Sequence, residues 1–228
     1  MARSFFIAGT DTDVGKTTIA TGLLHVARSA GLSTAAVKPV ASGCELTGHG
    51  LRNSDALALM AECNPALEYA TVNPFAFAPA IAPHIAAREA GIELSAERLA
   101  DAVESVLNCR ADFTLVEGAG GWRVPLSGQQ YLSALPVLLG LPVILVVGVR
   151  LGCINHAVLS AEAIARDGLT LAGWVANIVD PATSRLEENL ATLEQLLPAP
   201  CLGRVPRLAR ADAQQVAQHL TLAPLQLA

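Results

Sequence analysis

A glycine-rich segment near the N-terminus carries the residue types best suited to phosphate chemistry. Residues 9–18 read GTDTDVGKTT and end in Gly-Lys-Thr-Thr, as phosphate-binding loops do. In such a loop, backbone N–H groups and a helix N-terminus bind phosphate oxygens. The lysine reaches the β- and γ-phosphates, and the hydroxyl that follows binds Mg²⁺. Lys16 and Thr17 are therefore the candidates for these two roles.

The spacing of this segment departs from the usual pattern by one residue. Gly9 precedes Gly15 by six positions instead of five. The alternative interpretation is an ordinary strand-to-helix turn that ends in an exposed lysine. A strand pattern before the segment and a helix pattern after it favour the phosphate loop.

A second ligand for the metal is expected at the end of a neighbouring strand. Glu117 ends the apolar run FTLVE and is followed by Gly118, Ala119, Gly120 and Gly121. An acid at the end of a buried strand is costly unless it is paired or bound to a metal. Glycines let a ligand approach the backbone closely. The alternative for Glu117 is a solvated acid at a turn.

Two further charged residues give weaker signals. Asp55 begins a helical stretch, where an acidic residue is common because it stabilises the helix N-terminus. Lys38 ends a short apolar run, where a lysine at a sheet edge is the more common explanation. Taken alone, neither residue predicts a site.

The elements that must position these residues alternate along the chain. Strand patterns cover residues 4–8, 34–38, 113–117, 142–147, 171–177 and 201–205, and helix patterns cover 15–30, a stretch capped by Ser95, 155–167 and 184–196. The continuously apolar strands are typical of a parallel sheet buried on both faces. We expect an α/β fold of the phosphate-loop NTPase type, with a mostly parallel sheet, helices on both faces and a single domain over residues 1–228. Ligands of such folds bind outside the carboxyl ends of the strands.

Two stretches have no regular pattern and are expected to be loops. Residues 41–53 are rich in Gly, Ser and Thr, and residues 73–83 contain Pro74, Pro79 and Pro83. Both are long enough to be functional.

Composition excludes several classes of function. The 228 residues are 52% hydrophobic and 15% charged, which indicates a large core and excludes disorder. The net charge of −5 leaves no basic field for nucleic acid. The longest apolar run, residues 135–149, is interrupted by Pro136, Gly140 and Pro142, so no membrane span is expected. Five scattered cysteines and no signal-peptide pattern indicate a cytoplasmic protein with reduced thiols.

Taken together, the motifs resemble one family, the dethiobiotin synthetases, over nearly the whole chain. The resemblance rests on GTDTDVGKT (9–17), KPVASG (38–43), GLRNSDAL (50–57), ATVNPFAF (70–77), APHI (82–85), VEGAGGW (116–122), PVILVVGVRLGCINH (142–156), LAGWVAN (171–177) and PAPCLG (198–203). It implies a homodimer that closes the ureido ring of dethiobiotin in biotin biosynthesis. The substrates would be 7,8-diaminononanoate, CO₂ or bicarbonate, and ATP, with Mg²⁺ as cofactor.

The resemblance also implies roles for individual residues. Lys16 and Lys38 would be catalytic, and Thr17, Asp55 and Glu117 would bind Mg²⁺. The nucleotide would contact Asp13, Val14, Gly15, Lys16, Thr17, Thr18, Asp55, Glu117, Gly118, Ala119, Gly120, Asn177, Ile178, Pro206, Arg207 and Leu208. The diamine would contact Ser42 and, at the subunit interface, the partner's helix start at Gly152, Cys153 and Asn155. Asp13 is a conservative departure from the family pattern. Arg150 keeps the charge of the expected lysine but alters the donor geometry, and the match is poor after Leu208.

Three other functions compete with this interpretation. A partner-switching ATPase of the ParA or MinD type usually has a second lysine five positions before the first, where this chain has Asp11. An amide synthetase of the cobyrinic-acid type would need a glutaminase domain, for which the chain has no spare length. A nucleotide-binding interaction module without catalysis would tolerate the loss of Lys16 or Lys38.

Overall fold

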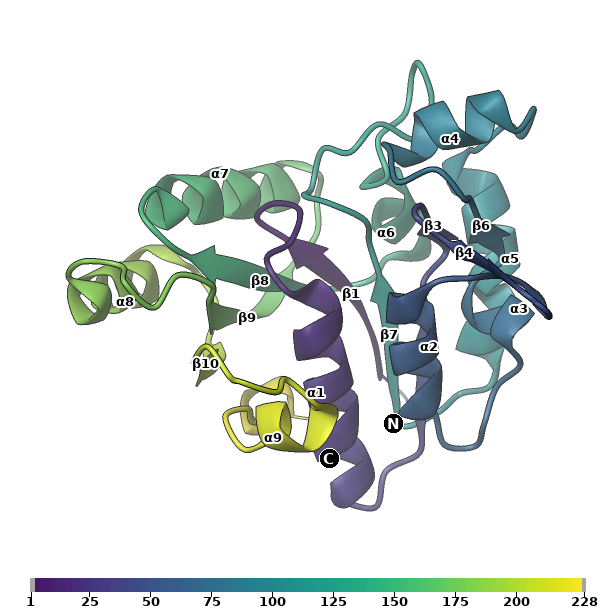
Figure 1. Ribbon diagram of the computed structural model, residues 1–228. Helices are drawn as coiled ribbons and strands as arrows, with labels where there is room; N and C mark the ends of the chain where they lie inside the picture. The colour runs from purple at the N-terminus through teal and green to yellow at the C-terminus, as the bar shows by residue number, and fades with distance from the viewer. Residues whose placement is uncertain (1–2, 227–228) are drawn as a thin grey trace.

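The computed structural model describes residues 3–226 and is built around a six-stranded sheet (Figure 1). All strand pairs in this sheet are parallel, and the order is β10-β9-β8-β1-β7-β2. The strands are β1 (Arg3–Gly9), β2 (Thr34–Val37), β7 (Phe113–Glu117), β8 (Val143–Val149), β9 (Leu171–Ile178) and β10 (Cys201–Val205). Each lies within two residues of a strand predicted from the sequence. The predicted fold class is confirmed.

Alternation along the strands explains why their sequences are continuously apolar. In β1, Phe6 and Ala8 belong to the hydrophobic cluster on one face of the sheet, whereas Ile7 belongs to the cluster on the other. In β8, Leu145 and Val146 divide between the two clusters in the same way. Because side chains alternate across a strand, burial on both faces requires an apolar residue at every position.

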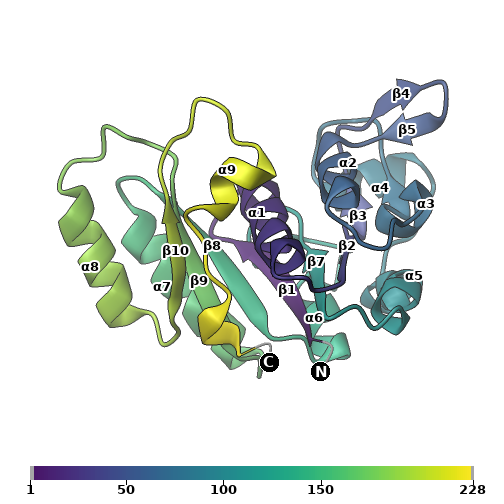
Figure 2. The ribbon, with the colours of Figure 1, turned by 90° about the horizontal axis from the view of Figure 1, so that it is seen from below.

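Helices cover both faces of the sheet (Figure 2). One face packs against α1 (Lys16–Ser29), α2 (Ser54–Ala61) and α9 (Ala213–Ala217); the other packs against α4 (Pro83–Glu89), α5 (Ala96–Asn108), α6 (Ala134–Leu139), α7 (Cys153–Arg166) and α8 (Leu186–Leu196). A short helix, α3 (Tyr69–Val72), and a 3₁₀ turn at Ala223–Leu225 complete the helical elements of the described chain. Within residues 3–226, every helix is too short or too polar to cross a lipid bilayer.

Three of the described helices, α2, α5 and α9, begin at side-chain caps. Ser95 Oγ accepts a hydrogen bond from the backbone N–H of Arg98 at 3.2 Å, which confirms the predicted start of α5. Asn53 Oδ1 accepts from the N–H of Ala56 at 3.1 Å and begins α2. Such caps satisfy N–H groups that have no partner inside the helix. The cap at Asn53 fixes the helical turn that carries Asp55.

The prediction that residues 41–53 and 73–83 are loops was wrong in part. Two short parallel strands, β3 (Val40–Ala41) and β6 (Phe75–Ala76), pair with each other, and β4 (Glu45–Thr47) and β5 (Gly50–Arg52) form an antiparallel hairpin. The two-residue connection of the hairpin precedes Gly50, whose φ of +90° suits a tight turn. The segments rich in glycine and proline therefore contain a hairpin and two very short strands. Strands of two or three residues are harder to detect from sequence than long apolar strands.

Candidate active site

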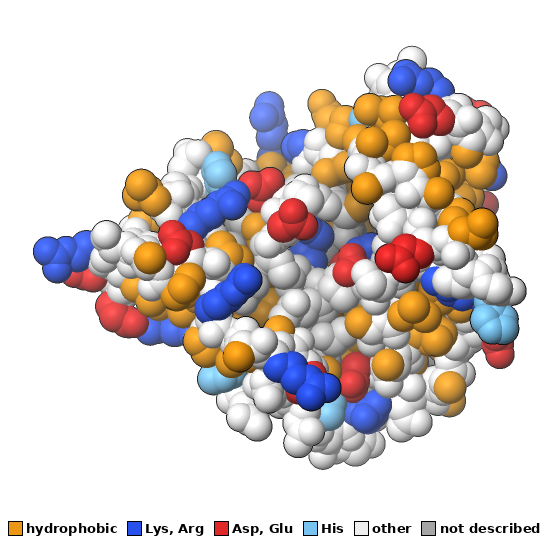
Figure 3. Space-filling view, viewed as in Figure 1, with side chains coloured by type: hydrophobic (Ala, Val, Ile, Leu, Met, Phe, Trp, Pro, Cys, Tyr) orange, Lys and Arg blue, Asp and Glu red, His pale blue; other side chains and the backbone are white. Residues whose placement is uncertain are grey.

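A cavity of about 810 Å³ opens at the carboxyl ends of β1, β2 and β7. The phosphate loop lines one side with Thr12, Asp13 and residues 15–18, and Lys38, Asp55 and Glu117 lie at its base. The opposite wall is more apolar and consists of residues 40–42, 80–83 and 123–125, with Ala119 and Gly120 between. The space-filling view shows acidic and basic side chains close together around a central hollow (Figure 3). The volume suits a nucleotide or a comparable small molecule.

The backbone of the phosphate loop is shaped by two left-handed residues. Asp13 has φ of +58° and Gly15 has φ of +85°, and Gly15 is the N-cap of α1. Successive N–H groups in such a conformation point to one side and form a concave anion site. Left-handed φ is unfavourable for Asp13 by about 1–2 kcal/mol. Strain of this size is common in ligand-binding loops.

Val14 anchors this loop to the sheet. A Cβ atom on Gly148 would lie 2.6 Å from Val14 Cγ1, and one on Gly9 would lie 2.8 Å from Val14 Cγ2. The valine side chain therefore occupies space that only glycine leaves free on β1 and β8. Val14 thus contributes its side chain to the core, and only its backbone is available to a nucleotide.

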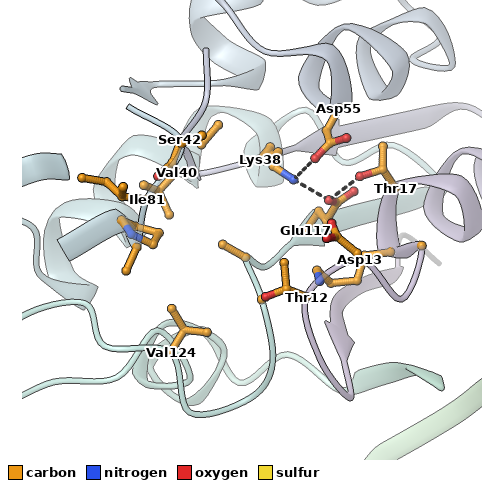
Figure 4. Close-up of a pocket in the computed structure, with 18 of the residues that line it drawn as sticks. Thr12, Asp13, Thr17, Lys38, Val40, Ser42, Asp55, Ile81, Glu117 and Val124 are labelled. Atoms are coloured by element: carbon orange, nitrogen blue, oxygen red, sulfur yellow. Dashed lines mark hydrogen bonds and ion pairs between the residues drawn. The ribbon is translucent and has the colours of Figure 1, made fainter. Parts of the chain in front are cut away.

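Thr17 and Lys38 contact Glu117 from distant parts of the sequence, and Asp55 joins this cluster through Lys38 (Figure 4). Lys38 Nζ donates hydrogen bonds to Glu117 Oε1 and to Asp55 Oδ2, both at 2.6 Å, and Thr17 Oγ1 donates to Glu117 Oε1 at 2.7 Å. Glu117 is 1% exposed and Lys38 is 6% exposed. These positions exclude the interpretation of Lys38 as an exposed edge lysine and of Glu117 as a solvated acid.

The oxygen atoms of this cluster fit a hard divalent cation. Glu117 Oε2 is buried and has no hydrogen-bond partner within the described part of the chain. A buried carboxylate oxygen without a partner is unfavourable and is often explained by an ion. The Thr17 hydroxyl and the half-exposed Asp55 carboxylate lie beside it. Hydroxyl and carboxylate oxygens are the ligands that Mg²⁺ prefers.

The two lysines of the cavity, Lys16 and Lys38, are the only lysines in the sequence. Burial lowers the pKa of Lys16, and the charge of Glu117 offsets this only in part, so its pKa is below the usual value. Burial also acts on Lys38, but Glu117 and Asp55 outweigh it and raise the pKa of Lys38. Asp55 responds in the opposite way, because Lys38 outweighs burial and lowers the pKa of Asp55. The pKa values of the two lysines are therefore shifted in opposite directions, because their charge environments differ within one cavity.

The two lysines are expected to titrate on opposite sides of the ordinary lysine pKa of 10.5. Protein labelled with ¹³C at lysine Cε should give two lysine NMR signals, which Lys16→Arg assigns.

The Lys38 contribution to stability is present below the ordinary lysine pKa and is lost as pH rises through its raised pKa. The Asp55 contribution is present above the ordinary aspartate pKa and is lost as pH falls through its lowered pKa. Two coincident titration curves would contradict these charge environments.

The residues of β9 and after β10 that are predicted to contact the nucleotide lie outside the cavity lining. Asn177 and Ile178 end β9, and residues 206–208 follow β10, whose Val205 is paired with Asn177. Asn177 Nδ2 donates to the carbonyl oxygen of Val14 at 2.8 Å. Asn177 therefore adjoins the loop through a direct hydrogen bond.

The residues predicted at the α7 start also lie outside the cavity lining. Gly152 is the N-cap of α7 with φ of +93°, and Cys153 and Asn155 occupy its first turn. Leu151, immediately before them, is 92% exposed. Arg150 Nη2 forms an ion pair with Asp11 Oδ2 in the phosphate loop at 2.6 Å. The α7 start thus adjoins the outer side of the loop.

Among the glycines after β7, Gly118 and Gly120 differ in surroundings. A Cβ on Gly118 would lie 2.7 Å from Cζ of Phe6, so close packing on β1 requires glycine there. Gly120 has φ of +59° and lines the cavity. Of the two glycines, only Gly120 faces the space available to a ligand.

Sequence reasoning missed Arg123 in the cavity wall. The Arg123 guanidinium donates two hydrogen bonds to the carboxylate of Asp167, at 2.7 and 2.8 Å. Trp122 Nε1 donates to Asp167 Oδ2 at 2.9 Å. This bidentate pair ties the segment after β7 to the end of α7. No local pattern indicates a contact between residues so far apart in the chain.

Comparison with known proteins identifies close relatives. A family model described as "AAA domain" matches residues 3–215. A protein named ATP-dependent dethiobiotin synthetase BioD from Pseudomonas paraeruginosa (strain PA7) is 77% identical over 222 residues, covering 97% of each chain. Proteins of the same name from Pseudomonas aeruginosa (strain PAO1) and Cellvibrio japonicus are 74% and 60% identical, covering 97% and 98% of this chain and 97% of each relative.

Similar solved structures share the fold at low sequence identity. A ParA family ATPase from Chlorobium tepidum aligns with a TM-score of 0.59 and 14% identity, over 99% of this chain and 93% of that one. A MinC:MinD complex from Aquifex aeolicus aligns with a TM-score of 0.57 and 14% identity, over 94% of this chain and 86% of that one. At such identity the likeness establishes a common architecture and leaves function to the site.

Proposed function

The chain belongs to the dethiobiotin synthetase family, and from this premise we propose that it makes dethiobiotin, ADP and phosphate from 7,8-diaminononanoate, CO₂ and ATP. It is an ATP-dependent enzyme with a role in biotin biosynthesis. One observation above all supports the proposed reaction. The buried Lys38, held by Asp55 and Glu117, shares one cavity with Lys16 of the phosphate loop.

The first step forms a C–N bond between one substrate amine and CO₂. The nitrogen lone pair attacks the carbon of CO₂, and the amine releases a proton, which gives a carbamate. Because an alkylamine is protonated at neutral pH, the site must favour its neutral form. A second positive charge nearby disfavours protonation. Lys38 carries that charge, since its carboxylate partners keep its pKa high.

The second step transfers the γ-phosphoryl group of ATP to a carbamate oxygen. The bond from the γ-phosphorus to the bridging oxygen breaks, ADP leaves, and a carbamic–phosphoric anhydride forms. Such transfers depend on positioning and on neutralised charge. Lys16 and the N–H groups of residues 13–18 position the phosphates and neutralise their charge from one side, and Lys38 supplies a positive charge from the base of the cavity.

The third step closes the ring. The second amine attacks the carbonyl carbon of the anhydride, the bond to the phosphate oxygen breaks, and phosphate leaves with the proton that the amine loses. When both amines are held near one carbon, the entropic advantage approaches roughly 7–11 kcal/mol at its favourable limit. The apolar wall formed by Val40, Ala41 and residues 80–83 limits the access of water to the anhydride.

Mg²⁺ is the proposed cofactor, and Thr17, Asp55 and Glu117 are the residues that would hold it. When bound, it neutralises charge on the phosphate oxygens. The orphaned Oε2 of Glu117 supports this assignment. Since Lys38 donates to Oε1, Glu117 can bind Lys38 through Oε1 and Mg²⁺ through Oε2.

Glu117→Gln is expected to raise the Mg²⁺ concentration needed for half-maximal activity by at least about tenfold, because even supporting residues of metal sites cost 10–100-fold in affinity. Glutamine keeps the size of the side chain and removes its charge. Activity measured against free Mg²⁺ at fixed ATP tests this. Glu62→Gln is the matched control, since Glu62 pairs with Arg28 and His25 on α1. An unchanged Mg²⁺ requirement in Glu117→Gln would remove this residue from the metal site.

The remaining residues divide between the two ends of the substrates. We propose that the purine contacts Asn177, Ile178, Pro206, Arg207 and Leu208. Asn177 is bonded to the phosphate loop, and residues 206–208 follow Val205, which is paired with Asn177. Ser42 is proposed to contact the diamine. Its Oγ is buried at the cavity and has no hydrogen-bond partner within the described residues.

A homodimer is proposed to complete the diamine site. Gly152, Cys153 and Asn155 lie outside the cavity of their own chain, which supports a role in the site of a second copy. The free N–H groups of the α7 start suit the distant carboxylate of the diamine. Measurement of the mass in solution tests the dimer.

We place the protein in the cytoplasm, where its cysteines would stay reduced.

Product formation from purified protein tests the proposed reaction. Protein, 7,8-diaminononanoate, ATP, Mg²⁺ and ¹⁴C-labelled bicarbonate are expected to give labelled dethiobiotin and one ADP per product. ATP hydrolysis that is indifferent to the diamine would favour a partner-switching ATPase instead. A product that depends on glutamine would favour an amide synthetase, and no turnover at all would favour an interaction module.

A further inference from the structure

We propose that the hydroxyl of Tyr69 is a positioning group for this reaction. It joins two hydrogen-bond branches that set Lys38 and Asp55 relative to each other. This inference rests on the proposed function. Tyr69 is the first residue of α3 and lies outside the cavity lining, so it acts through other residues.

The first branch leads from Tyr69 to the backbone of Lys38. The Tyr69 hydroxyl donates to Asn73 Oδ1 at 3.0 Å, and Asn73 Nδ2 donates to the carbonyl oxygen of Lys38 at 2.7 Å. Asn73 is 3% exposed. Because a buried amide is costly unless it is paired, both bonds are strongly favoured in the folded protein.

The second branch leads from Tyr69 to the helix that carries Asp55. The backbone N–H of Asn53 donates to the Tyr69 hydroxyl at 2.7 Å, and Asn53 Oδ1 caps the first turn of α2. Asn53 Nδ2 also donates to the carbonyl oxygen of Ser42 at 3.4 Å. One hydroxyl therefore connects the segments that present Lys38, Asp55 and Ser42 to the cavity.

Lys38 depends on this support because the sheet does not hold it. Pairing between β2 and β7 ends at Val37. The next residue, Lys38, donates its N–H to the carbonyl oxygen of Val72 at 2.7 Å, and its carbonyl oxygen accepts from Asn73. The end of α3 thus takes the place of a neighbouring strand. A shift of about 1 Å at a reacting group can cost about 10²-fold in rate.

The tyrosine itself is held in a fixed orientation. The guanidinium of Arg52 lies 4.1 Å from the centroid of the Tyr69 ring, a favourable cation–π distance. Burial raises the pKa of Tyr69, so its hydroxyl keeps the proton that it donates to Asn73 at neutral pH. The ring is therefore anchored independently of the hydroxyl.

Tyr69→Phe tests the inference because it keeps the ring and removes only the hydroxyl. We expect kcat to fall about tenfold, which corresponds to about 1.4 kcal/mol, because both branches lose the hydroxyl that joins them, and we expect KM for ATP to change less than about twofold. Tyr131→Phe is the matched control, since Tyr131 is half exposed and lies outside this chain of bonds, and it should retain full activity. Activity of Tyr69→Phe within about twofold of the unmodified protein would overturn the inference.

A spectroscopic readout separates positioning from general destabilisation. In protein labelled at lysine Cε, Tyr69→Phe should move the NMR signal of Lys38 and leave that of Lys16 in place. A loss of kcat with both signals unmoved would overturn the inference. If the unmodified protein makes no dethiobiotin, the proposed function fails; if it does and Tyr69→Phe equals it, only this inference fails.

A second variant covers the case in which Tyr69→Phe does not fold. Asn73→Asp keeps the acceptor for Tyr69 and loses the donor to Lys38, so it should lower kcat in the same way. Where both variants fold, the losses should be less than additive in the double variant, because both variants break the branch to Lys38 and only Tyr69→Phe also breaks the branch to Asn53. Full additivity of the two losses, or normal activity of Asn73→Asp, would overturn the inference.

Discussion

Replacement of Lys38 with methionine is expected to lower kcat about 10²–10³-fold, the usual cost of removing one preorganised charge from an active site. Lys38 is the buried cation at the base of the cavity, and both of its carboxylate partners lie 2.6 Å from Nζ. In the proposed reaction, the substrate amine would then lose the charge that favours its neutral form, and the transferring phosphoryl group would lose a counter-charge. Steady-state rates with all three substrates measure the effect.

The same replacement also affects folding, so it needs a matched control. Methionine leaves the buried Glu117 carboxylate without its cationic partner, which costs about 3–5 kcal/mol. The double variant Lys38→Met with Glu117→Gln removes the unpaired charge. We expect this double variant to unfold at nearly the temperature of the unmodified protein and to remain inactive. If it is stable and turns over at a nearly normal rate, Lys38 has no chemical role.

Lys16→Met is expected to lower kcat/KM for ATP by about 10²–10³-fold with little change in stability. Within the described chain, Lys16 Nζ donates to the carbonyl oxygen of Asp11 at 3.2 Å and otherwise faces the cavity. The loss of Lys16 Nζ leaves the carbonyl oxygen of Asp11 to be hydrated by water, so the free energy of unfolding should change by no more than about 1 kcal/mol. This variant therefore isolates the contact with phosphate.

Arg28→Met is the control for Lys16→Met. Arg28 lies at the other end of α1, where it pairs with Glu62. Removal of this charge should leave kcat/KM for ATP within about twofold, because Arg28 lies outside the cavity lining and its ion pair contributes little. Equal losses in both variants would mean that Lys16 acts through the charge of the helix and not through a contact with the nucleotide. Calorimetric ATP binding to each variant separates affinity from turnover.

The features that could be predicted from the sequence have local causes. A strand that is buried on both faces must be apolar nearly throughout, so the runs that form β7 and β8 were visible as strands. A glycine-rich loop before a helix limits the backbone to a few shapes, which is why Lys16 could be placed. Chain order and parallel pairing then place the end of β7 beside the phosphate loop.

The features that could not be predicted depend on contacts between distant segments. Nothing near Lys38 in the sequence indicates that Asn73 holds its carbonyl oxygen or that Asp55 meets its ammonium group. The bidentate pair of Arg123 with Asp167 is equally remote in sequence. Such contacts follow from packing, which no local periodicity encodes.

Motif matching also names some residues whose structural role differs from the expected one. Val14 belongs to the predicted nucleotide loop, but its side chain fills the space beside Gly9 and Gly148. Gly118 was expected to admit a ligand, and its lack of a side chain admits Phe6 instead. In both cases the sequence indicates the correct segment, and only the fold shows which atom of the segment faces the cavity.

The proposed reaction requires the triphosphate of ATP to lie between Lys16 and Lys38, the only two lysines of the sequence. Protein labelled with ¹³C at lysine Cε tests this directly when a non-hydrolysable ATP analogue is added with Mg²⁺. We expect both lysine signals to shift with the same binding curve, and the Lys38 signal to shift again when the diamine is added. If the nucleotide binds and either lysine signal stays in place, the triphosphate does not lie between Lys16 and Lys38.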